Sequence, residues 1–235
     1  MLIFNKIEIF IFYFIKKMKV YLEANIGAGK TTMLNKLSEH TFNTYSTEFI
    51  PEPINDWEKL KDNNGLNILE NFYNDQTKWA FAFQMNSFIS RANKLDNKKS
   101  QIIVSERSVF TDKNCFAINC FESQKLNKIE WDIYCNWHDW LVNKFNLNSD
   151  AYIYLKTTPE KCYERIKSRN REGESEITLE YLKLLHDKHE SWLQNENVPI
   201  LILYADCEIN SKEYYSNIEN IKKFIENIAI KKYGI

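Results

Sequence analysis

Residues 24–31, with the sequence ANIGAGKT, carry the clearest chemical signal in the chain. They fit the pattern G-x-x-x-x-G-K-[ST], with alanine in place of the first glycine. Glycines let backbone N–H groups curl around phosphate oxygens, and a following helix N-terminus adds the positive end of its dipole. In this pattern Lys30 reaches the β- and γ-phosphates and the Thr31 hydroxyl binds Mg²⁺. The residues expected to bind the nucleotide here are Asn25, Ile26, Gly27, Ala28, Gly29, Lys30, Thr31 and Thr32.

Ala24 is the departure from this pattern. If the position requires a positive φ, alanine costs about 1–2 kcal/mol there, and if it does not, the substitution is almost free. The alternative is a Gly/Ala loop before an ordinary helix. It is disfavoured because a strand pattern, the loop and a helix pattern follow one another in register.

Further groups suited to phosphoryl transfer follow other apolar runs. Glu52 lies between two prolines that restrict its backbone, and a carboxylate so placed can accept the proton of an attacking hydroxyl group. Trp57 follows closely and can stack on a flat base. Glu106 offers a carboxylate for the Mg²⁺ shell, and Arg107 offers a positive charge for the transferring phosphoryl group.

Three arginines, Arg165, Arg169 and Arg171, lie close together further along the chain. Arg165 and Arg169 are one helical turn apart, as a lid that closes over phosphates requires. Taken singly, a Glu-Arg pair is often a surface ion pair, and an arginine cluster is often a solvated face. Because the charged groups follow successive strand patterns, together they favour a kinase.

Short apolar runs alternate with longer helical patterns, and these must position the charged groups. The predicted strands are residues 19–23, 101–105, 151–155 and 199–204, with a fifth that runs into Pro51. The predicted helices are residues 31–40, 66–97, 128–145, 159–170 and 178–195, with a last helix from Ser211. Short strands without polar alternation, separated by helices, indicate a parallel sheet covered on both faces. We expect an α/β, P-loop NTPase-type three-layer fold with a five-stranded parallel sheet, a short arginine-rich lid and a ligand beyond the carboxyl ends of the strands.

Two fragments match GTPase motifs, D-x-x-G at residues 62–65 and N-K-x-D at residues 93–96. In a GTPase each motif must follow a buried strand, because the loop after that strand contacts the nucleotide. Asp62 follows a segment without strand character, and Asn93 ends a long helical pattern. We therefore interpret both matches as coincidences.

Length and composition allow one sizeable core. The chain has 235 residues, 44% hydrophobic and 14% aromatic, and no linker or repeat divides it, so residues 18–235 are predicted to form a single domain. The balance of 31 basic against 32 acidic residues favours neither a nucleic-acid nor a membrane partner. Five cysteines without C-x-x-C or zinc-ligand spacing indicate reduced thiols, no structural metal and a cytoplasmic protein.

Residues 1–17, MLIFNKIEIFIFYFIKK, form an N-terminal hydrophobic extension. The apolar run of residues 9–15 is far shorter than the ~20 residues of a membrane helix, and no small-residue cleavage site follows it. The segment also lacks the Arg and Ser of a mitochondrial presequence. We expect a dispensable extension, with a membrane anchor or an unusual targeting peptide, and hence a mitochondrial location, as the alternatives.

Taken together, the motifs resemble the deoxynucleoside kinase family of deoxycytidine, deoxyguanosine and mitochondrial thymidine kinases. The resemblance runs from about Met18 to Ile225. Besides the phosphate loop, it is carried by PEPINDW at residues 51–57, WAFAFQ at residues 79–84, Ser90-Arg91, ERSVFTD at residues 106–112 and YLKLLHDKHESWL at residues 181–193. Several closely spaced motifs in the right order make the resemblance specific.

The resemblance implies an enzyme of nucleotide salvage that transfers the γ-phosphate of ATP, with Mg²⁺, to the 5′-hydroxyl of a deoxynucleoside. It makes Glu52 the general base, with Arg107 and Lys30 as further catalytic residues. Thr31 and Glu106 would serve the metal. The lid contacts to ATP would be Arg165, Arg169 and Arg171.

The resemblance also implies a set of substrate contacts. Trp57 and Phe116 would sandwich the base with Phe83 beside it, and the Gln84 amide would pair with the base edge. Tyr73 and Glu174 would hold the 3′-hydroxyl. The family's lid often carries two adjacent glutamates, whereas this chain has Gly173 before Glu174.

Arg91 and Asp112 bear on the choice of base. Family members that select deoxycytidine or purine deoxynucleosides tend to carry Arg and Asp at the matching positions, and those that accept thymidine have neutral residues. A buried Asp can accept from an exocyclic amine while Arg neutralises it and donates to ring acceptors. We therefore expect deoxyguanosine, deoxyadenosine or deoxycytidine to be favoured over thymidine. The alternative is that Asp112 and Arg91 form a structural pair without contact to the base. Ser87 beside Gln84 resembles the deoxyguanosine kinase branch more than the deoxycytidine kinase branch.

Two rival functions use the same scaffold. A nucleoside monophosphate kinase would need extra basic residues for the acceptor phosphate, and an arginine would suit position 52 better than Glu52. A non-catalytic nucleotide-binding subunit is favoured only by Ala24 and Gly173. The resemblance further implies a homodimer through helical residues 66–97 and 128–145, although aromatic residues on such helices are more often core.

Overall fold

The computed structural model describes residues 17–40, 44–96, 98–171 and 173–234, so the predicted extension over residues 1–17 lies outside them except for Lys17. The sheet consists of β2 (Thr47–Ile50), β3 (Ile102–Glu106), β1 (Met18–Glu23), β4 (Ala151–Lys156) and β5 (Ile200–Tyr204), in that spatial order. Every neighbouring pair of strands is parallel. All five predicted strands are confirmed, each within a few residues of its predicted bounds.

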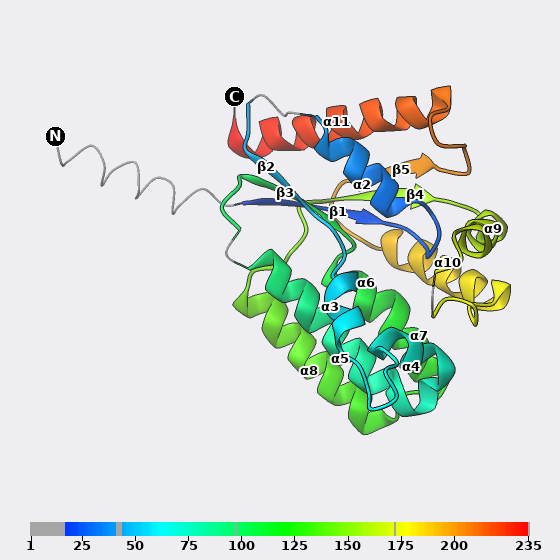
Figure 1. Ribbon diagram of the computed structural model, residues 1–235. Coiled ribbons are helices and arrows are strands. Elements are labelled where there is room, and N and C mark those ends of the chain that lie inside the picture. The colour runs from blue at the N-terminus through cyan, green and yellow to red at the C-terminus, as the bar shows by residue number, and fades with distance from the viewer. Residues whose placement is uncertain (1–16, 41–43, 97, 172, 235) are drawn as a thin grey trace.

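The helices cover both faces of this sheet (Figure 1). In chain order they are α2 (Lys30–Ser38), α3 (Ile54–Lys59), α4 (Ile68–Asn74), α5 (Gln76–Leu95), α6 (Val109–Thr111), the π-helix η1 (Asp112–Ala117), α7 (Ile118–Glu122), α8 (Lys128–Lys144), α9 (Pro159–Arg169), α10 (Leu179–Leu193) and α11 (Lys212–Tyr233). The predicted three-layer α/β fold is therefore confirmed. The single-domain assignment of residues 18–235 stays a prediction.

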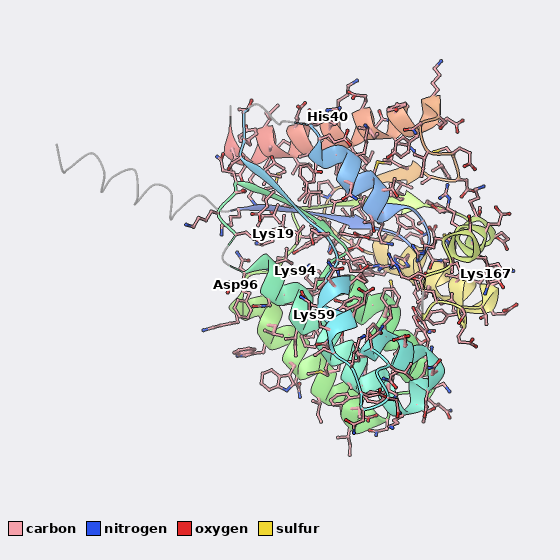
Figure 2. All side chains as sticks on the ribbon, in the orientation of Figure 1. Lys19, His40, Lys59, Lys94, Asp96 and Lys167 are labelled. Carbon is pink, nitrogen blue, oxygen red and sulfur yellow. The ribbon has the colours of Figure 1, made fainter. Side chains whose placement is uncertain are left out.

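Successive side chains of β1 enter two different hydrophobic clusters, as the two-residue period of a strand requires. Val20 packs in one cluster with Leu34 of α2. Tyr21 packs in the other, with Leu95 of α5 and Val142 of α8. Side chains fill the space between the sheet and the helices above and below it (Figure 2). Both faces of β1 are buried, and this includes its polar residues Lys19 and Glu23.

The prediction of one helix over residues 66–97 is wrong, because the chain breaks at Asp75. This residue has φ −146° and ψ 84°, and its carboxylate accepts from the Lys78 N–H at 3.1 Å as the N-cap of α5. Asn67 caps the preceding helix α4 in a capping box with Glu70. Capping satisfies N–H groups that the first turn of a helix leaves unpaired. The break lies in the polar run NDQTK at residues 74–78, and aspartate is a residue type that favours the N-cap position.

Four short elements, α3, α6, η1 and α7, were not predicted from the sequence, and two of them carry predicted site residues. The first is α3, which follows Pro53 and carries Trp57. The second is η1, in which Asp112 and Phe116 lie about one turn apart. The π-helix is rare and occurs frequently at functional sites.

The structural context of the GTPase-like fragments confirms that they are coincidences. The Asp62 carboxylate accepts from the backbone N–H groups of Asn64 and Leu66, which forms a local turn. Asn93 lies within the last turns of α5. Neither residue follows a strand. All five cysteines are free, and among the described residues no helix has the length and apolar character to cross a membrane.

Candidate active site

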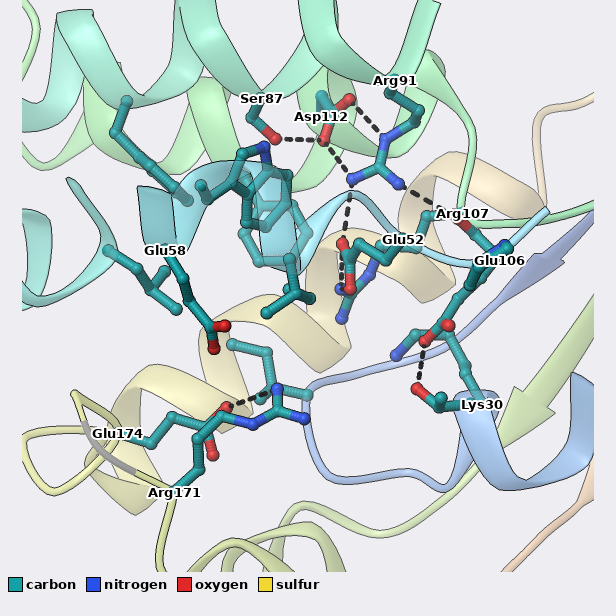
Figure 3. A pocket seen from close by; sticks show the side chains of 18 of the residues that line it. Lys30, Glu52, Glu58, Ser87, Arg91, Glu106, Arg107, Asp112, Arg171 and Glu174 are labelled. Carbon is teal, nitrogen blue, oxygen red and sulfur yellow. Dashed lines mark hydrogen bonds and ion pairs between the residues drawn. The ribbon is translucent and has the colours of Figure 1, made fainter. Parts of the chain in front are cut away.

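A cavity of about 350 Å³ lies at the carboxyl ends of β1, β2 and β3. Parallel pairing brings the loops that follow these three strands to one edge of the sheet. Charged groups point into the cavity from both sides (Figure 3). The predicted site residues that line it are Ile26, Gly29, Lys30, Thr31, Thr32, Glu52, Trp57, Tyr73, Phe83, Gln84, Arg91, Glu106, Arg107, Asp112, Phe116, Arg169, Arg171 and Glu174.

The loop after β1 is shaped by two glycines. Gly27 and Gly29 have φ values of 80° and 91°, which glycine adopts without strain. A Cβ atom on Gly27 would lie 2.5 Å from the carbonyl oxygen of Cys162, so the loop packs directly against α9. Ala24 is not among the residues with a positive φ. Alanine therefore costs little at this position.

The ammonium group of Lys30 is folded back onto the loop. It donates to the carbonyl oxygens of Ala24 at 3.1 Å and Asn25 at 2.7 Å. Burial, and then the positive charge of Arg107, lower the pKa of Lys30 to about 7. A polyanion bound in the loop would favour the charged ammonium form and reverse this shift.

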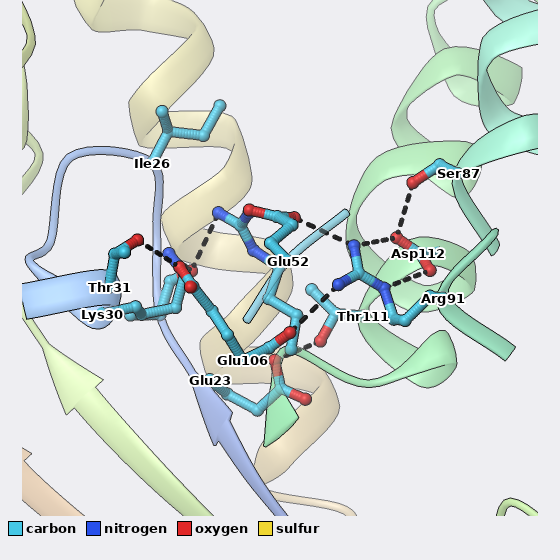
Figure 4. A network of polar contacts seen from close by, with 12 residues as sticks. Glu23, Ile26, Lys30, Thr31, Glu52, Ser87, Arg91, Glu106, Thr111 and Asp112 are labelled. Carbon is cyan, nitrogen blue, oxygen red and sulfur yellow. Dashed lines mark hydrogen bonds and ion pairs between the residues drawn. The ribbon is translucent and has the colours of Figure 1, made fainter. Parts of the chain in front are cut away.

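Thr31 and Glu106 form a pair of oxygen donors beside Lys30 (Figure 4). The Thr31 hydroxyl donates to Glu106 Oε1 at 2.8 Å. The other carboxylate oxygen, Oε2, is buried without a hydrogen-bond partner. Hydroxyl and carboxylate oxygens are the ligands that Mg²⁺ prefers, and the ion commonly takes its other ligands from phosphates and water. The pair therefore fits a Mg²⁺ site next to a bound triphosphate.

Glu52 lies between two guanidinium groups. Arg107 Nη1 donates to both carboxylate oxygens, at 2.8 and 2.9 Å, and Arg91 Nη2 donates to Oε1 at 2.9 Å. Burial by itself would raise the pKa of the Glu52 carboxyl, but the charges of Arg107, Arg91 and Lys30 hold that pKa well below its usual range. The carboxylate is thus ionised throughout the physiological range, and the two arginines also lower its basicity.

Arg107 is held in an unusual backbone conformation. Its φ is 59°, in the left-handed region that a residue with a Cβ atom seldom adopts. Its Nε is buried without a hydrogen-bond partner, and its guanidinium carbon lies 5.0 Å from the ring centroid of Phe116. Residues with such backbone strain cluster at functional sites.

Asp112 and Arg91 form a buried ion pair at the end of the cavity near α5. Arg91 Nε and Nη2 donate to the two oxygens of Asp112 at 2.9 and 3.2 Å. The Ser87 hydroxyl also donates to Asp112, at 3.1 Å, and Arg91 Nη1 donates to the Glu106 carbonyl oxygen at 3.0 Å. Arg91 therefore connects Asp112, Glu52 and β3 in one network.

Aromatic rings form an apolar slot beside this ion pair. Trp57 meets Phe83 edge to face at 5.4 Å between ring centroids, and the Trp57 indole donates to the Ser90 hydroxyl at 2.8 Å. Gln84 Nε2 makes a long contact of 3.8 Å with Cys120 Sγ, while Gln84 Oε1 is buried without a partner. A flat ring with a polar edge fits such a slot, because an unpaired buried oxygen requires a donor.

Glu174 lies opposite, where the chain returns after α9. Arg169 donates to both of its oxygens, at 2.8 and 2.7 Å, and Arg171 reaches it at 3.5 Å. Gly173 has φ 83°, and a Cβ atom there would lie 2.9 Å from Glu70 Cγ. The positive φ and this close approach give a physical reason for glycine at position 173, where the family's lid often carries the first of two adjacent glutamates. Burial, and then Glu174, raise the pKa of the Tyr73 hydroxyl.

Four predicted contacts do not line the cavity: Asn25, Gly27, Ala28 and Arg165. Asn25 has a structural role, because its side chain donates to the Leu182 carbonyl oxygen at 2.8 Å and accepts from the Ile26 N–H. Arg165 donates to the carbonyl oxygens of Ala205 at 3.0 Å and Cys207 at 2.7 Å. It thus binds the loop after β5, and its role in a lid stays a prediction.

Some lining residues were not assigned from the sequence, among them Phe72, Tyr181, Glu58 and Lys94. Phe72 stacks on Phe83 at 4.6 Å between ring centroids. Tyr181 is the first residue of a motif already recognised, and its hydroxyl is buried without a partner. An unpaired hydroxyl in a cavity is a signal that only coordinates provide. Glu58 directly follows the motif at residues 51–57, and Lys94 lies in the fragment at residues 93–96 that was set aside as a coincidence.

The arrangement combines the parts that phosphoryl transfer requires. A phosphate-binding loop with an ammonium group and a Mg²⁺ ligand pair lies at one end of the cavity, and an aromatic slot with polar edges lies at the other. Between them lies an ionised carboxylate, Glu52, with the cation of Arg107 beside it. Lys30 and Glu52 thus line the same cavity.

Comparisons with known proteins agree with this geometry. The family described as deoxynucleoside kinase matches residues 20–229. Human deoxycytidine kinase is 37% identical over 242 residues, covering 89% of this chain and 92% of the relative. Deoxycytidine kinase 2 of Gallus gallus is 36% identical, covering 88% and 90%, and the mitochondrial deoxyguanosine kinase of Xenopus laevis is 33% identical, covering 89% and 90%.

These relatives are named for nucleoside acceptors, which disfavours the monophosphate-kinase alternative, and they are named as enzymes, which disfavours a non-catalytic subunit. The resemblance seen in the sequence is thereby confirmed over most of the chain. The chain belongs to the deoxynucleoside kinase family, as an ATP-dependent phosphotransferase of deoxynucleoside salvage.

Proposed function

We propose that this kinase phosphorylates deoxynucleosides whose base carries an amine or a guanine edge, namely deoxycytidine, deoxyadenosine or deoxyguanosine, in preference to thymidine. The observation that carries this proposal is the buried Asp112–Arg91 pair, with Ser87 donating to the same carboxylate. Asp112 can accept from an exocyclic amine, and Arg91 can donate to a ring acceptor. Thymine presents a carbonyl and a methyl group there, and neither can donate to the carboxylate.

In the proposed reaction the 5′-hydroxyl oxygen attacks the γ-phosphorus of ATP while the bond to the β,γ-bridging oxygen breaks. The proton of the hydroxyl goes to Glu52, and ADP leaves. Arg107 contacts both oxygens of Glu52, so it can orient the carboxylate and then turn to the charge that develops on the phosphoryl group. As Arg107 moves towards phosphate, Glu52 loses a stabilising cation and becomes more basic.

The remaining roles follow from position. Lys30 and the loop backbone bind the triphosphate, and Thr31 with Glu106 serves Mg²⁺, as their oxygen atoms allow. Trp57, Phe83 and Phe116 hold the base with Gln84, and Tyr73 and Glu174 hold the 3′-hydroxyl, with Arg169 and Arg171 above the phosphates. A cytoplasmic location stays a prediction, since one relative is named as mitochondrial.

We further propose that the chain forms a homodimer through α8 and the adjoining part of α5. Ile129, Ile133, Trp137 and Trp140 recur at helical spacing on α8 and are exposed, with Trp140 at 52%. Exposed apolar patches of this kind mark protein–protein interfaces. Ile89 of the neighbouring α5 is exposed as well.

Replacing Glu52 by Gln tests the proposed base. We expect Glu52→Gln to lower kcat by about 10²–10⁴-fold with little change in nucleoside affinity, because the amide cannot take up the proton. Steady-state kinetics and equilibrium binding of the nucleoside measure the two effects. Glu48→Gln is the matched control, since Glu48 lies on β2, the strand that precedes Glu52, and its carboxylate pairs with the partly exposed Lys98 at 2.7 Å. Unchanged turnover of Glu52→Gln would assign the base elsewhere.

The base preference is tested by kcat/KM for the four deoxynucleosides with ATP. We expect thymidine to be used at least ~10²-fold less efficiently than the best of the other three, because its base has no exocyclic amine to donate to the Asp112 carboxylate. Asp112→Asn removes the charge but keeps the shape of the side chain. It should therefore reduce the ratio of kcat/KM between the best deoxynucleoside and thymidine. Thymidine turnover equal to that of deoxyguanosine in the wild-type enzyme would contradict the proposal.

The pKa of Lys30 predicts a proton linkage. With a pKa of about 7 in the free enzyme, Lys30 is mostly neutral at pH 8 and mostly charged at pH 6. Because bound phosphates favour the charged form, ATP binding should take up close to one proton at pH 8 and almost none at pH 6. Calorimetry of Mg²⁺-saturated ATP in buffers of different ionisation enthalpy measures this uptake. Equal uptake at both pH values would show that Lys30 is not the linked group.

The homodimer is tested by sedimentation velocity. We expect the wild-type protein to have twice the 28.1 kDa chain mass and Trp140→Glu to have the mass of one chain, because a carboxylate is costly in a dry interface. Ile202→Glu is the control, since Ile202 is equally exposed, at 54%, on the edge strand β5. A dimer that survives Trp140→Glu, or one that only Ile202→Glu disrupts, would locate the interface elsewhere.

A further inference from the structure

Glu23 is a buried carboxyl group that the proposed mechanism does not use. It is the last residue of β1, directly before the phosphate-binding loop, and none of its surface is exposed. It does not line the active-site cavity. A buried carboxyl group is costly unless hydrogen bonds compensate it, so the partners of Glu23 indicate its function.

Both oxygens of Glu23 bind the segment that follows β3 (Figure 4). Oε1 accepts from the backbone N–H of Ser108 at 3.0 Å, and Oε2 accepts from the Thr111 hydroxyl. The Ser108 hydroxyl in turn accepts from the Thr111 N–H at 3.2 Å, as the N-cap of α6. Glu23 thus holds the first turn of α6 at both ends.

The two residues that Glu23 holds are the chain neighbours of two active-site residues. Ser108 follows Arg107, whose positive φ costs about 1 kcal/mol for a residue with a Cβ atom. Thr111 precedes Asp112, the first residue of η1. A strained conformation persists only where its surroundings fix it, and the Ser108 N–H bond to Glu23 is one such constraint.

We propose that Glu23 is a positioning residue for the transfer reaction, which sets the places of Arg107 and Asp112 through Ser108 and Thr111. The inference rests on the proposed roles of Arg107 at Glu52 and of Asp112 at the base. In this proposal β1 has two functions. It leads into the triphosphate-binding loop, and through Glu23 it also positions the residues on the nucleoside side of the cavity.

The chemistry of the site predicts which substitution is tolerated. Burial raises the pKa of the Glu23 carboxyl, although the hydrogen bonds from Ser108 and Thr111 oppose the shift. The amide group of glutamine has nearly the shape of this carboxyl group and offers one acceptor oxygen and one N–H₂ donor. Gln at position 23 can accept from the Ser108 N–H and donate to the Thr111 hydroxyl oxygen. Met has a similar length and neither function.

The test compares Glu23→Gln with Glu23→Met in the full-length enzyme. We expect Glu23→Met to lower kcat/KM for the best deoxynucleoside by about 10–100-fold, since small misplacements of reacting groups have effects of this size. We expect the affinity for ATP alone to change less than about 3-fold and Glu23→Gln to retain activity within about 3-fold. Thr111→Val should act in the same direction, and the double variant should lose little more than Glu23→Met.

Several results would overturn the inference. These are full activity in Glu23→Met, equal losses in ATP affinity and nucleoside efficiency, equal losses in the Gln and Met variants, or additive effects of Glu23→Met and Thr111→Val. If Glu23→Met does not fold, the test is the comparison of Thr111→Val with Thr111→Ser. Thr111→Ser keeps the hydroxyl group and should retain wild-type kinetics, whereas Thr111→Val should lower kcat/KM. A wild-type enzyme without activity on any deoxynucleoside would instead contradict the proposed function.

Discussion

Mutual neutralisation of buried charges is the constraint on which this site depends. Three carboxylates and three cations lie together, at most slightly exposed, at the ends of three parallel strands: Glu52, Glu106, Asp112, Lys30, Arg91 and Arg107. An isolated charge in such a place costs several kcal/mol, so each group is stable only while its partners are present. Arg91 is central because it binds Glu52, Asp112 and the β3 backbone at once. Removing it would leave Asp112 without its ion-pair partner and Glu52 with Arg107 alone.

The helical layer below the sheet determines what this charge cluster can recognise. Helix α5 carries Gln84, Ser87 and Arg91 at spacings of three and four residues, so all three lie on the face towards the cavity. The π-helix η1 supplies Asp112 and Phe116 from the other side. Two packed helices therefore supply groups for polar edge recognition, charge compensation and ring stacking. A change in their packing would alter all three together.

The sequence predicts most of this architecture because the central strands β1, β3 and β4 are buried on both faces and the loop motif is local. Strand–loop–helix register placed Lys30 and Thr31 correctly, and polar groups after strands placed Glu52 and Arg107. What could not be predicted depends on contacts between distant segments. The break at Asp75 is an exception, because the polar run of residues 74–78 and an aspartate at the N-cap are local signals of it. The bonds of Arg165 to the loop after β5, and of Glu23 to the start of α6, join residues that no local pattern connects.

The packing of Gly27 against α9 has a consequence for how such loops are interpreted. Its missing side chain is required by a carbonyl oxygen of the protein itself, 2.5 Å from where a Cβ atom would lie. A descendant that had lost all affinity for nucleotides would still be under selection to keep this glycine, for the sake of its fold. Part of the phosphate-loop motif therefore reflects helix packing. The presence of this glycine in a related chain would be weaker evidence for catalysis than the presence of Lys30.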